Sequence, residues 1–357
     1  MKTKGQLRAA FPAVLPFLFA ACAGIHSAVS PGKSPVVYPP PPDTARIQYL
    51  TSFSVSTDIT GQRSGFMRMI AGSEAPFPVT KPYGVSIQKG KIYVCDSKIS
   101  GLEIFDLEES SFEVFNPTGR GTLKRPVNCA VDTEGMLYVA DTERKDVVIF
   151  DKNGEYASSI MDRPDMKPVD VCVYRDKILL LDLKNQQVRV YTKKTHAFLY
   201  SIPDSNAAKE AMLFSPTNMC VSNDSIYVSD MGDFNVKVYS IDGRHLSTIG
   251  SHGSGHGQFA RPKGVAVDRS GRLYVVDAGF ENVQMFNSDG SLLMFFGGPY
   301  KGPGDMWLPA KVIVDYENLR YFESLVYKGF RLRYLIIVTN QFGPDKISVY
   351  GYVEEKR

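Results

Sequence analysis

Residues 262–277 read Pro-Lys-Gly-Val-Ala-Val-Asp-Arg-Ser-Gly-Arg-Leu-Tyr-Val-Val-Asp. Two short apolar runs flank an Asp-x-x-Gly turn, which is typical of two antiparallel strands joined by a tight connection. Related segments recur along the chain, and each begins with a proline. The six prolines are Pro82, Pro126, Pro168, Pro216, Pro262 and Pro309, at successive spacings of 44, 42, 48, 46 and 47 residues. A period of this length predicts a repeat architecture.

Each repeat contains more than these two strands. The second run ends at the same position in every repeat, at Asp96, Asp141, Asp182, Asp230, Asp277 and, with asparagine, Asn340. An alternating third run follows, and glycine turns after it suit a hairpin to a fourth strand. Four short antiparallel strands per repeat indicate one blade of a β-propeller.

The last repeat ends soon after its third strand and is therefore one strand short. Residues 47–53, which read Ile-Gln-Tyr-Leu-Thr-Ser-Phe, can supply the missing strand. Such pairing of the two ends of the chain protects an otherwise open ring. The sequence therefore predicts an all-β fold, a six-bladed β-propeller whose last blade is completed by the N-terminal strand.

The repeat resembles the NHL repeat, whose pattern Pro-x-Gly-Val-Ala-Val-Asp-x-x-Gly-x-Leu-Tyr-Val-x-Asp is intact from Pro262 to Asp277. The resemblance covers Lys81 to about Val353. In residues 334–341 and 349–352 the final repeat is also similar to NHL-repeat lipoproteins of anaerobic, cytochrome-rich bacteria. The resemblance implies a propeller of NHL type located in a bacterial cell envelope.

The first residues of the chain have the pattern of an export signal. Lys2, Lys4 and Arg8 precede an apolar stretch of 13 residues at 9–21, which matches a signal-peptide core and is too short for a membrane span. Residues 18–22, Leu-Phe-Ala-Ala-Cys, resemble the bacterial lipobox, which implies that Cys22 is diacylated and becomes the mature N-terminus. The alternative is an ordinary signal peptide followed by a cysteine that is there by chance.

The predicted organisation has three parts: a lipoprotein signal peptide at 1–21, a lipidated cysteine with a Pro/Ser-rich tether at 22–45, and the propeller at 46–357. The tether composition is typical of an extended linker. In the lipoprotein family, a residue such as Ala23 after the cysteine implies sorting to the outer membrane. We therefore expect membrane contact through the lipid anchor only.

Composition argues against nucleic acid as a partner. The formal net charge is only +3, hydrophobic residues make up 43% of the chain and charged residues 22%. No run of five or more like charges occurs, so the sequence lacks the basic footprint of a polyanion-binding protein.

The residues that bind metals and cofactors elsewhere do not form a complete set. The aspartate after each second strand recurs in five repeats, which favours a structural role at the following turn over metal binding. His252 and His256 share one glycine-rich loop, but two ligands do not make a zinc site. No Cys-x-x-Cys-His motif is present, so covalent haem is excluded and no cofactor is expected.

Four cysteines follow Cys22, at Cys95, Cys129, Cys172 and Cys220. Cys172 and Cys220 occupy the same register in neighbouring repeats. Disulfides are compatible with an exported protein, and the alternative is that the cysteines are small buried apolar residues. The sequence does not decide between the two.

In propellers, ligands sit at the mouth of the central channel, near the start of each first strand. The residues predicted there are Tyr83, Asn128, Asp170, Asn218, Lys263 and Lys311. This set would suit hydrogen bonding to a small polar molecule or a peptide end; the alternative is a hydrated pore without a ligand. No paired carboxylates and no nucleophile with an adjacent base are present, so we predict no catalytic residues.

The sixth repeat has an insertion at 316–333. Its apolar residues Leu319, Phe322, Leu325 and Val326 have helical spacing, which predicts a short amphipathic helix. Tyr327, Arg331 and Arg333, together with Trp307, which we expect close by, form a candidate partner surface. The alternative is that the insertion only packs on the rim.

These features favour a non-enzymatic envelope lipoprotein whose propeller is a protein-binding scaffold, for example in an extracellular electron-transfer or secretion assembly. The alternative is a metal-dependent lactonase-like or lyase-like enzyme with its site in the channel, as in some related six-bladed propellers. Carbohydrate binding by surface tyrosines is a third hypothesis without a motif.

Overall fold

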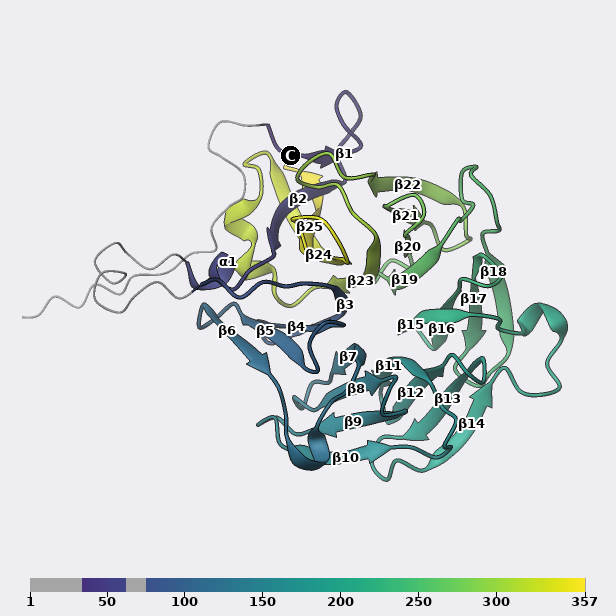
Figure 1. Cartoon of the computed structure of the whole chain (residues 1–357). Coiled ribbons are helices and arrows are strands. Elements are labelled where there is room, and N and C mark those ends of the chain that lie inside the picture. Colours follow the sequence, from purple (N-terminus) through teal and green to yellow (C-terminus); the bar gives the residue numbers. More distant parts are fainter. Residues whose placement is uncertain (1–33, 62–74, 357) are drawn as a thin grey trace, which may run out of the picture.

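A computed structural model describes residues 34–61 and 75–356 of the chain. The predicted signal peptide, Cys22 and the first part of the predicted tether lie outside these residues. The described residues form six antiparallel β-sheets that follow one another around a central axis (Figure 1). The prediction of a six-bladed all-β propeller is therefore confirmed.

The first three blades each consist of four strands in simple order. Blade 1 comprises β3 (Pro82–Gln88), β4 (Lys91–Asp96), β5 (Leu102–Asp106) and β6 (Ser111–Phe115). Blade 2 comprises β7 (Pro126–Val131), β8 (Leu137–Asp141), β9 (Asp146–Phe150) and β10 (Tyr156–Ile160). Blade 3 comprises β11 (Pro168–Tyr174), β12 (Lys177–Asp182), β13 (Gln187–Thr192) and β14 (Phe198–Ile202).

Blades 4 and 5 repeat this plan. Blade 4 comprises β15 (Pro216–Ser222), β16 (Ser225–Asp230), β17 (Asn235–Ser240) and β18 (His245–Ile249). Blade 5 comprises β19 (Pro262–Val267), β20 (Leu273–Asp277), β21 (Asn282–Phe286) and β22 (Leu292–Gly297). In Figure 1 the first strand of each blade faces the centre of the ring, and each of the six predicted prolines begins such a strand. Proline is tolerated at that position because the first residue of a strand need not donate to the ladder.

Blade 6 closes the ring with strands from both ends of the chain. Its own strands are β23 (Pro309–Asp315), β24 (Phe330–Asn340) and β25 (Ile347–Glu355), and β2 (Ile47–Phe53) pairs antiparallel with β25. The predicted closure by residues 47–53 is thus confirmed (Figure 1). The short strand β1 (Val37–Tyr38), from the segment assigned to the tether, pairs with β2 and adds a fifth strand.

The helical elements are short. They are α1 (Thr57–Thr60) and the 3-10 turns η1 (Gly119–Gly121), η2 (Lys209–Ala211), η3 (Leu319–Tyr321) and η4 (Glu323–Leu325). The insertion in blade 6 is helical as predicted, but as the two turns η3 and η4 instead of one amphipathic helix. Phe322, between the two turns, is fully buried against Phe53. No helix among the described residues is long and apolar enough to cross a membrane.

The recurring aspartates link two backbone segments. Asp141, which is fully buried, accepts hydrogen bonds from the amides of Lys124 and Arg125 before the blade's proline. It also accepts from the amides of Glu143 and Arg144 in the following turn. The structural interpretation of these aspartates is confirmed, and the contacts to the segment before the proline are an addition to it.

Candidate functional site

The six predicted channel residues lie on, or at the start of, the first strands of the blades. Five of them, Asn128, Asp170, Asn218, Lys263 and Lys311, are at most 5% exposed. Tyr83 is partly buried beside them. These residues therefore lie inside the channel and are not displayed at an open mouth.

One ion pair spans the channel. Lys311 on β23 of blade 6 places its Nζ 2.5 Å from Oδ2 of Asp170 on β11 of blade 3, and these blades are opposite each other in a ring of six. The Asp170 carboxylate also accepts hydrogen bonds from the amides of Val171 and Met219. Burial lowers the pKa of Lys311, but the Asp170 carboxylate outweighs this and raises it above its ordinary value. The pair closes the channel at this level.

The end of the channel nearest the prolines is cationic. Lys263 Nζ lies 5.2 Å from the centroid of the Tyr83 ring and 3.5 Å from Oε1 of Gln341. Burial, together with the positive charges of Arg261 and Lys81, lowers the pKa of Lys263 to about 8. No carboxylate forms an ion pair with Lys263 in the part of the chain that the structure describes.

Two buried side-chain amides in the channel have polar atoms without a protein partner in the described part of the chain. Asn128 donates from Nδ2 to the Val169 carbonyl at 2.7 Å, but its Oδ1 has no protein partner among the described residues. Neither side-chain polar atom of Asn218 has one. Buried polar atoms without protein partners are usually satisfied by water or a ligand, so this level of the channel is suited to water or a small polar molecule.

Next to the ion pair, the first strands of the blades line a mostly apolar cavity of about 250 Å³. Its lining includes Ser86, Lys311, several valines and the thiols of Cys129, Cys172 and Cys220. Burial raises the pKa of Cys220 to about 12, against the opposing effect of Lys311, and raises that of Cys172 as well. Since the thiolate is the nucleophile, these cysteines are poorly suited to covalent catalysis.

Candidate metal ligands do not gather in the channel. Within residues 34–61 and 75–356, no group of three or more His, Cys, Asp or Glu side chains could hold a metal ion. The Lys311 ammonium already neutralises Asp170, the one carboxylate among the six predicted channel residues. His252, one of the two loop histidines, packs against the ring of Phe234 at 4.4 Å.

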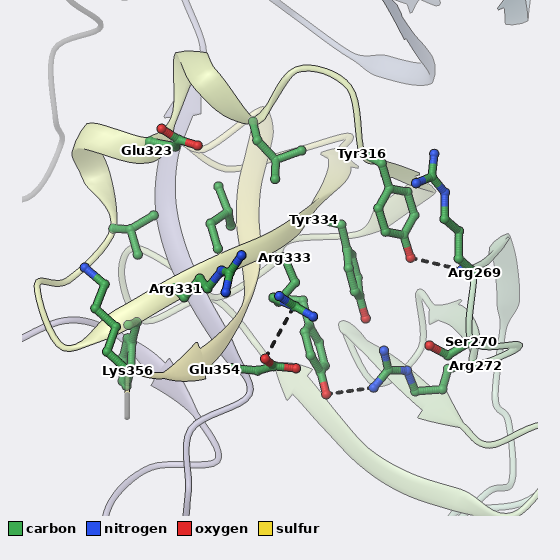
Figure 2. A pocket seen from close by; sticks show the side chains of 15 residues that line it. Arg269, Ser270, Arg272, Tyr316, Glu323, Arg331, Arg333, Tyr334, Glu354 and Lys356 are labelled. Atoms are coloured by element: carbon green, nitrogen blue, oxygen red, sulfur yellow. Dashed lines mark hydrogen bonds and ion pairs between the residues drawn. The ribbon is translucent and has the colours of Figure 1, made fainter.

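A larger cavity, of about 750 Å³, lies beneath the insertion at the other end of blade 6 (Figure 2). It is bounded by the insertion, the first part of β24, the end of β25 and the turn between β19 and β20. Five basic side chains line it against two acidic ones. The basic residues are Arg269, Arg272, Arg331, Arg333 and Lys356, and the acidic ones are Glu323 and Glu354.

Stacked tyrosines form the base of this cavity. The rings of Tyr334 and Tyr352 are 4.7 Å apart and inclined by 9°. Arg272 donates from Nη1 to the Tyr352 hydroxyl at 2.7 Å and from Nε to the buried Asp268 carboxylate at 2.6 Å. Asp268 also accepts from the Tyr334 hydroxyl at 2.8 Å. These bonds join blades 5 and 6 and hold the base in one conformation.

The basic residues above the base differ in how far they are neutralised. Arg333 forms a half-exposed ion pair with Glu354 at 3.3 Å. The Arg269 guanidinium lies over the Tyr316 ring at 4.2 Å, without a carboxylate. Arg331 and Lys356 are exposed and have no side-chain partner among the described residues. The cavity therefore presents net positive charge to a ligand.

The structure divides the predicted partner surface. Arg331 and Arg333 line the cavity, and the exposed Tyr327 packs on Phe330 beside it. The expected proximity of Trp307 to the insertion is wrong, because β23 runs between them and places Trp307 at its other end. Trp307 is 49% exposed there, with its ring near Tyr300 and Phe342.

Sequence reasoning missed the tyrosines and arginines that complete the cavity. Arg269 and Arg272 lie in the Asp-x-x-Gly turn of the repeat that decides the fold, and Tyr334 and Tyr352 lie on β24 and β25. A usable signal existed, because Tyr352 and Tyr334 are direct neighbours once β24 and β25 are paired as a hairpin.

Comparisons with known proteins agree with this fold. A family model described as a 6-bladed beta-propeller matches residues 207–354, less than half of the chain. A gluconolactonase from Xanthomonas campestris is similar at 15% identity, with a TM-score of 0.57 over 91% of this chain and 99% of that one. No curated protein matches the sequence.

Two further solved structures are similar. One is a protein of unknown function from Bacteroides thetaiotaomicron, with 15% identity and a TM-score of 0.58 over 87% of this chain and 76% of that one. The other is a streptogramin B lyase, with 13% identity and a TM-score of 0.53 over 77% of this chain and 84% of that one. At these identities the similarity establishes the six-bladed propeller fold alone.

Proposed function

We propose that this propeller is a non-enzymatic binding module, a scaffold that holds a partner protein in the cavity beneath the blade 6 insertion. The observation that supports this most is the cavity itself, about 750 Å³ in volume, open, cationic and floored by stacked tyrosines. Arginine and tyrosine are the residues most favoured at interface hot spots.

The expected result of a partner-capture experiment follows from this placement. Purification from native membranes with a Tyr327→Ala/Arg331→Ala/Arg333→Ala variant should lose the co-purifying proteins that the unmodified chain retains. These side chains are exposed, so the variant should remain folded. A matched variant at the other end of β23, Trp307→Ala/Phe342→Ala, should retain its partners. An identical set of captured proteins in all three samples would contradict the proposal.

We also propose that the chain is an exported lipoprotein with an NHL-type propeller, anchored through Cys22 to the outer membrane. The support is the lipobox-like sequence at 18–22 and the proline-rich stretch after it. Two or three acyl chains, at about 0.8 kcal/mol per buried methylene, make an anchor that does not dissociate.

The anchor can be tested by metabolic labelling with an alkyne fatty acid. Cys22→Ser should abolish labelling and move the protein from the membrane fraction to the soluble one, whereas Cys95→Ser, a change of a buried cysteine in blade 1, should leave labelling intact. Labelling that persists in the Cys22→Ser variant would refute lipidation at this residue.

The alternative, a lactonase-like or lyase-like enzyme, is favoured by one feature. Asn128, Asp170 and Asn218 occupy the same position in three neighbouring blades, with unpartnered amide atoms between them. The residues do not fit a bound cation, however, because the Lys311 ammonium holds the Asp170 carboxylate. Metal analysis of the purified protein discriminates the two functions, since one tightly held divalent ion per chain would favour the enzyme.

A further inference from the structure

One edge of β24 faces the cavity without a neighbouring strand. On one side β24 pairs with β25 along its length, from Phe330 opposite Glu355 to Thr339 opposite Ile347. On the other side β23 covers only the part from Leu335 to Asn340. Among the described residues, therefore, no strand pairs with the outer edge of residues 330–334, and of these the Phe330 amide already donates to the Tyr327 carbonyl.

This free edge is also a wall of the cavity. All five residues from Phe330 to Tyr334 line it, and in Figure 2 the strand crosses the cavity with Arg331 and Arg333 labelled along it. Because the Phe330 amide is already bonded, the available edge runs from Arg331 to Tyr334. At about 3.3 Å per residue it is roughly 13 Å long, enough for an added strand of about four residues. An unpaired edge of this kind is a template for an extended peptide.

The edge is selective about the charge of such a peptide. Arg333 is an extra residue in the pairing of β24 with β25, which makes a β-bulge between Leu332 and Tyr334. Bulges and charged side chains hinder pairing with a further strand. Here the charges are positive, so the electrostatic part of this hindrance is removed for a strand whose own side chains are acidic.

The positive charge continues beyond the edge. Arg269 and Lys356 flank it without carboxylate partners in the described part of the chain. A second cavity, of about 740 Å³, shares Arg331, Glu354 and Lys356 with the first and adds Arg46, Thr44 and Glu355, so its lining has three basic side chains against two acidic ones. A basic track therefore runs from the turn between β19 and β20 across β24 to the start of β2.

We infer that the Arg331–Tyr334 edge of β24 takes up an extended acidic segment of a partner protein as an added strand. Its backbone pairs with β24, and its Asp or Glu side chains face Arg269, Arg331 and Lys356. This inference rests on the proposed binding function and specifies the chemistry of the partner.

The test uses the purified full chain and a fluorescent seven-residue peptide, Thr-Glu-Val-Glu-Val-Asp-Thr. Anisotropy should show saturable binding, at least tenfold weaker for the Arg331→Glu/Lys356→Glu variant. A matched variant in other blades, Lys152→Glu/Lys194→Glu, changes two exposed lysines and should bind as the unmodified chain does. The same peptide with proline in place of its second Val keeps all three acidic side chains but lacks one backbone donor, so it should bind at least tenfold more weakly.

A second measurement tests directly whether the backbone of this edge is bonded to the peptide. Hydrogen exchange of backbone amides in residues 331–334 should slow when the peptide is bound, with no change at the first strands of blades 1 to 3. If the proline peptide binds equally well and exchange at 331–334 is unchanged, strand addition is refuted, and the cavity binds anions by charge alone. Absence of peptide binding with continued loss of partners in the Tyr327→Ala/Arg331→Ala/Arg333→Ala variant would refute this inference and leave the binding function standing.

Discussion

Deletion of residues 46–53 is expected to abolish cooperative folding of the propeller. The deletion removes β2, whose Ile47, Tyr49, Leu50 and Phe53 are at most 1% exposed. Loss of one large buried side chain costs about 2–5 kcal/mol, so the total is on the order of 10 kcal/mol. That is the size of the whole free energy of unfolding of a typical domain. Thermal unfolding followed by circular dichroism and calorimetry should show no sharp transition.

The geometry of blade 6 suggests a variant that should restore the folding lost in this deletion. β2 is antiparallel to β25, and the amide of Val353 donates to the carbonyl of Arg46, so the end of β25 lies next to the start of β2 (Figure 1). Residues 46–53 moved to follow residue 357 through a short turn should restore a cooperative transition. Deletion of residues 34–38 alone, which removes only β1, should leave the domain folded. A sharp transition at an unchanged temperature in the 46–53 deletion would contradict the closure.

The ring of six blades could be predicted from the sequence because the residues that mark each blade recur at a regular spacing. Each proline and each aspartate marks the same point of a blade, and the count of six follows from their spacing. β1 could not be predicted in this way, since Val37 and Tyr38 stand among prolines and pair only because β2 is already in place. The insertion deviates from its helical spacing because Phe322 turns into the core between blades 6 and 1.

The channel contains a contact that the short repeat motifs alone did not predict. All six predicted positions lie on the channel strands, but the sequence analysis did not pair Asp170 with Lys311, which are 141 residues apart. Each stands two residues after its proline, and their blades are three apart in a ring of six. Opposite charges at one register in opposite blades are a signal that a propeller sequence can reveal. The cavity beneath the insertion depends on side-chain packing of two blades, and its sequence signal was limited to the pairing of Tyr334 with Tyr352 across the β24–β25 hairpin.

Replacement of Lys311 by methionine is expected to destabilise the protein by about 3–5 kcal/mol, because it leaves the Asp170 carboxylate buried without a counter-charge. In the double variant Asp170→Asn/Lys311→Met neither charge of the pair remains. The asparagine oxygen can still accept from the Met219 amide, but the Val171 amide, which donates to the other carboxylate oxygen, loses its acceptor. Its free energy of unfolding should therefore fall by only about 1–2 kcal/mol, the cost of one unpaired buried amide, which is less than the loss in the single variant. Urea unfolding of the single and double variants gives the coupling energy directly.

An exposed ion pair provides the comparison for this double-mutant cycle. Arg125 and Glu143 are 3.2 Å apart with side chains more than half exposed, so Arg125→Met should cost less than about 1 kcal/mol. Equal losses from Lys311→Met and Arg125→Met would show that the channel pair is solvated and does not close the channel. The double channel variant also separates the two candidate functions, because a scaffold that binds beneath the insertion should keep its partners when the Asp170–Lys311 pair is removed. Loss of partners in that variant would instead place the functional site in the channel.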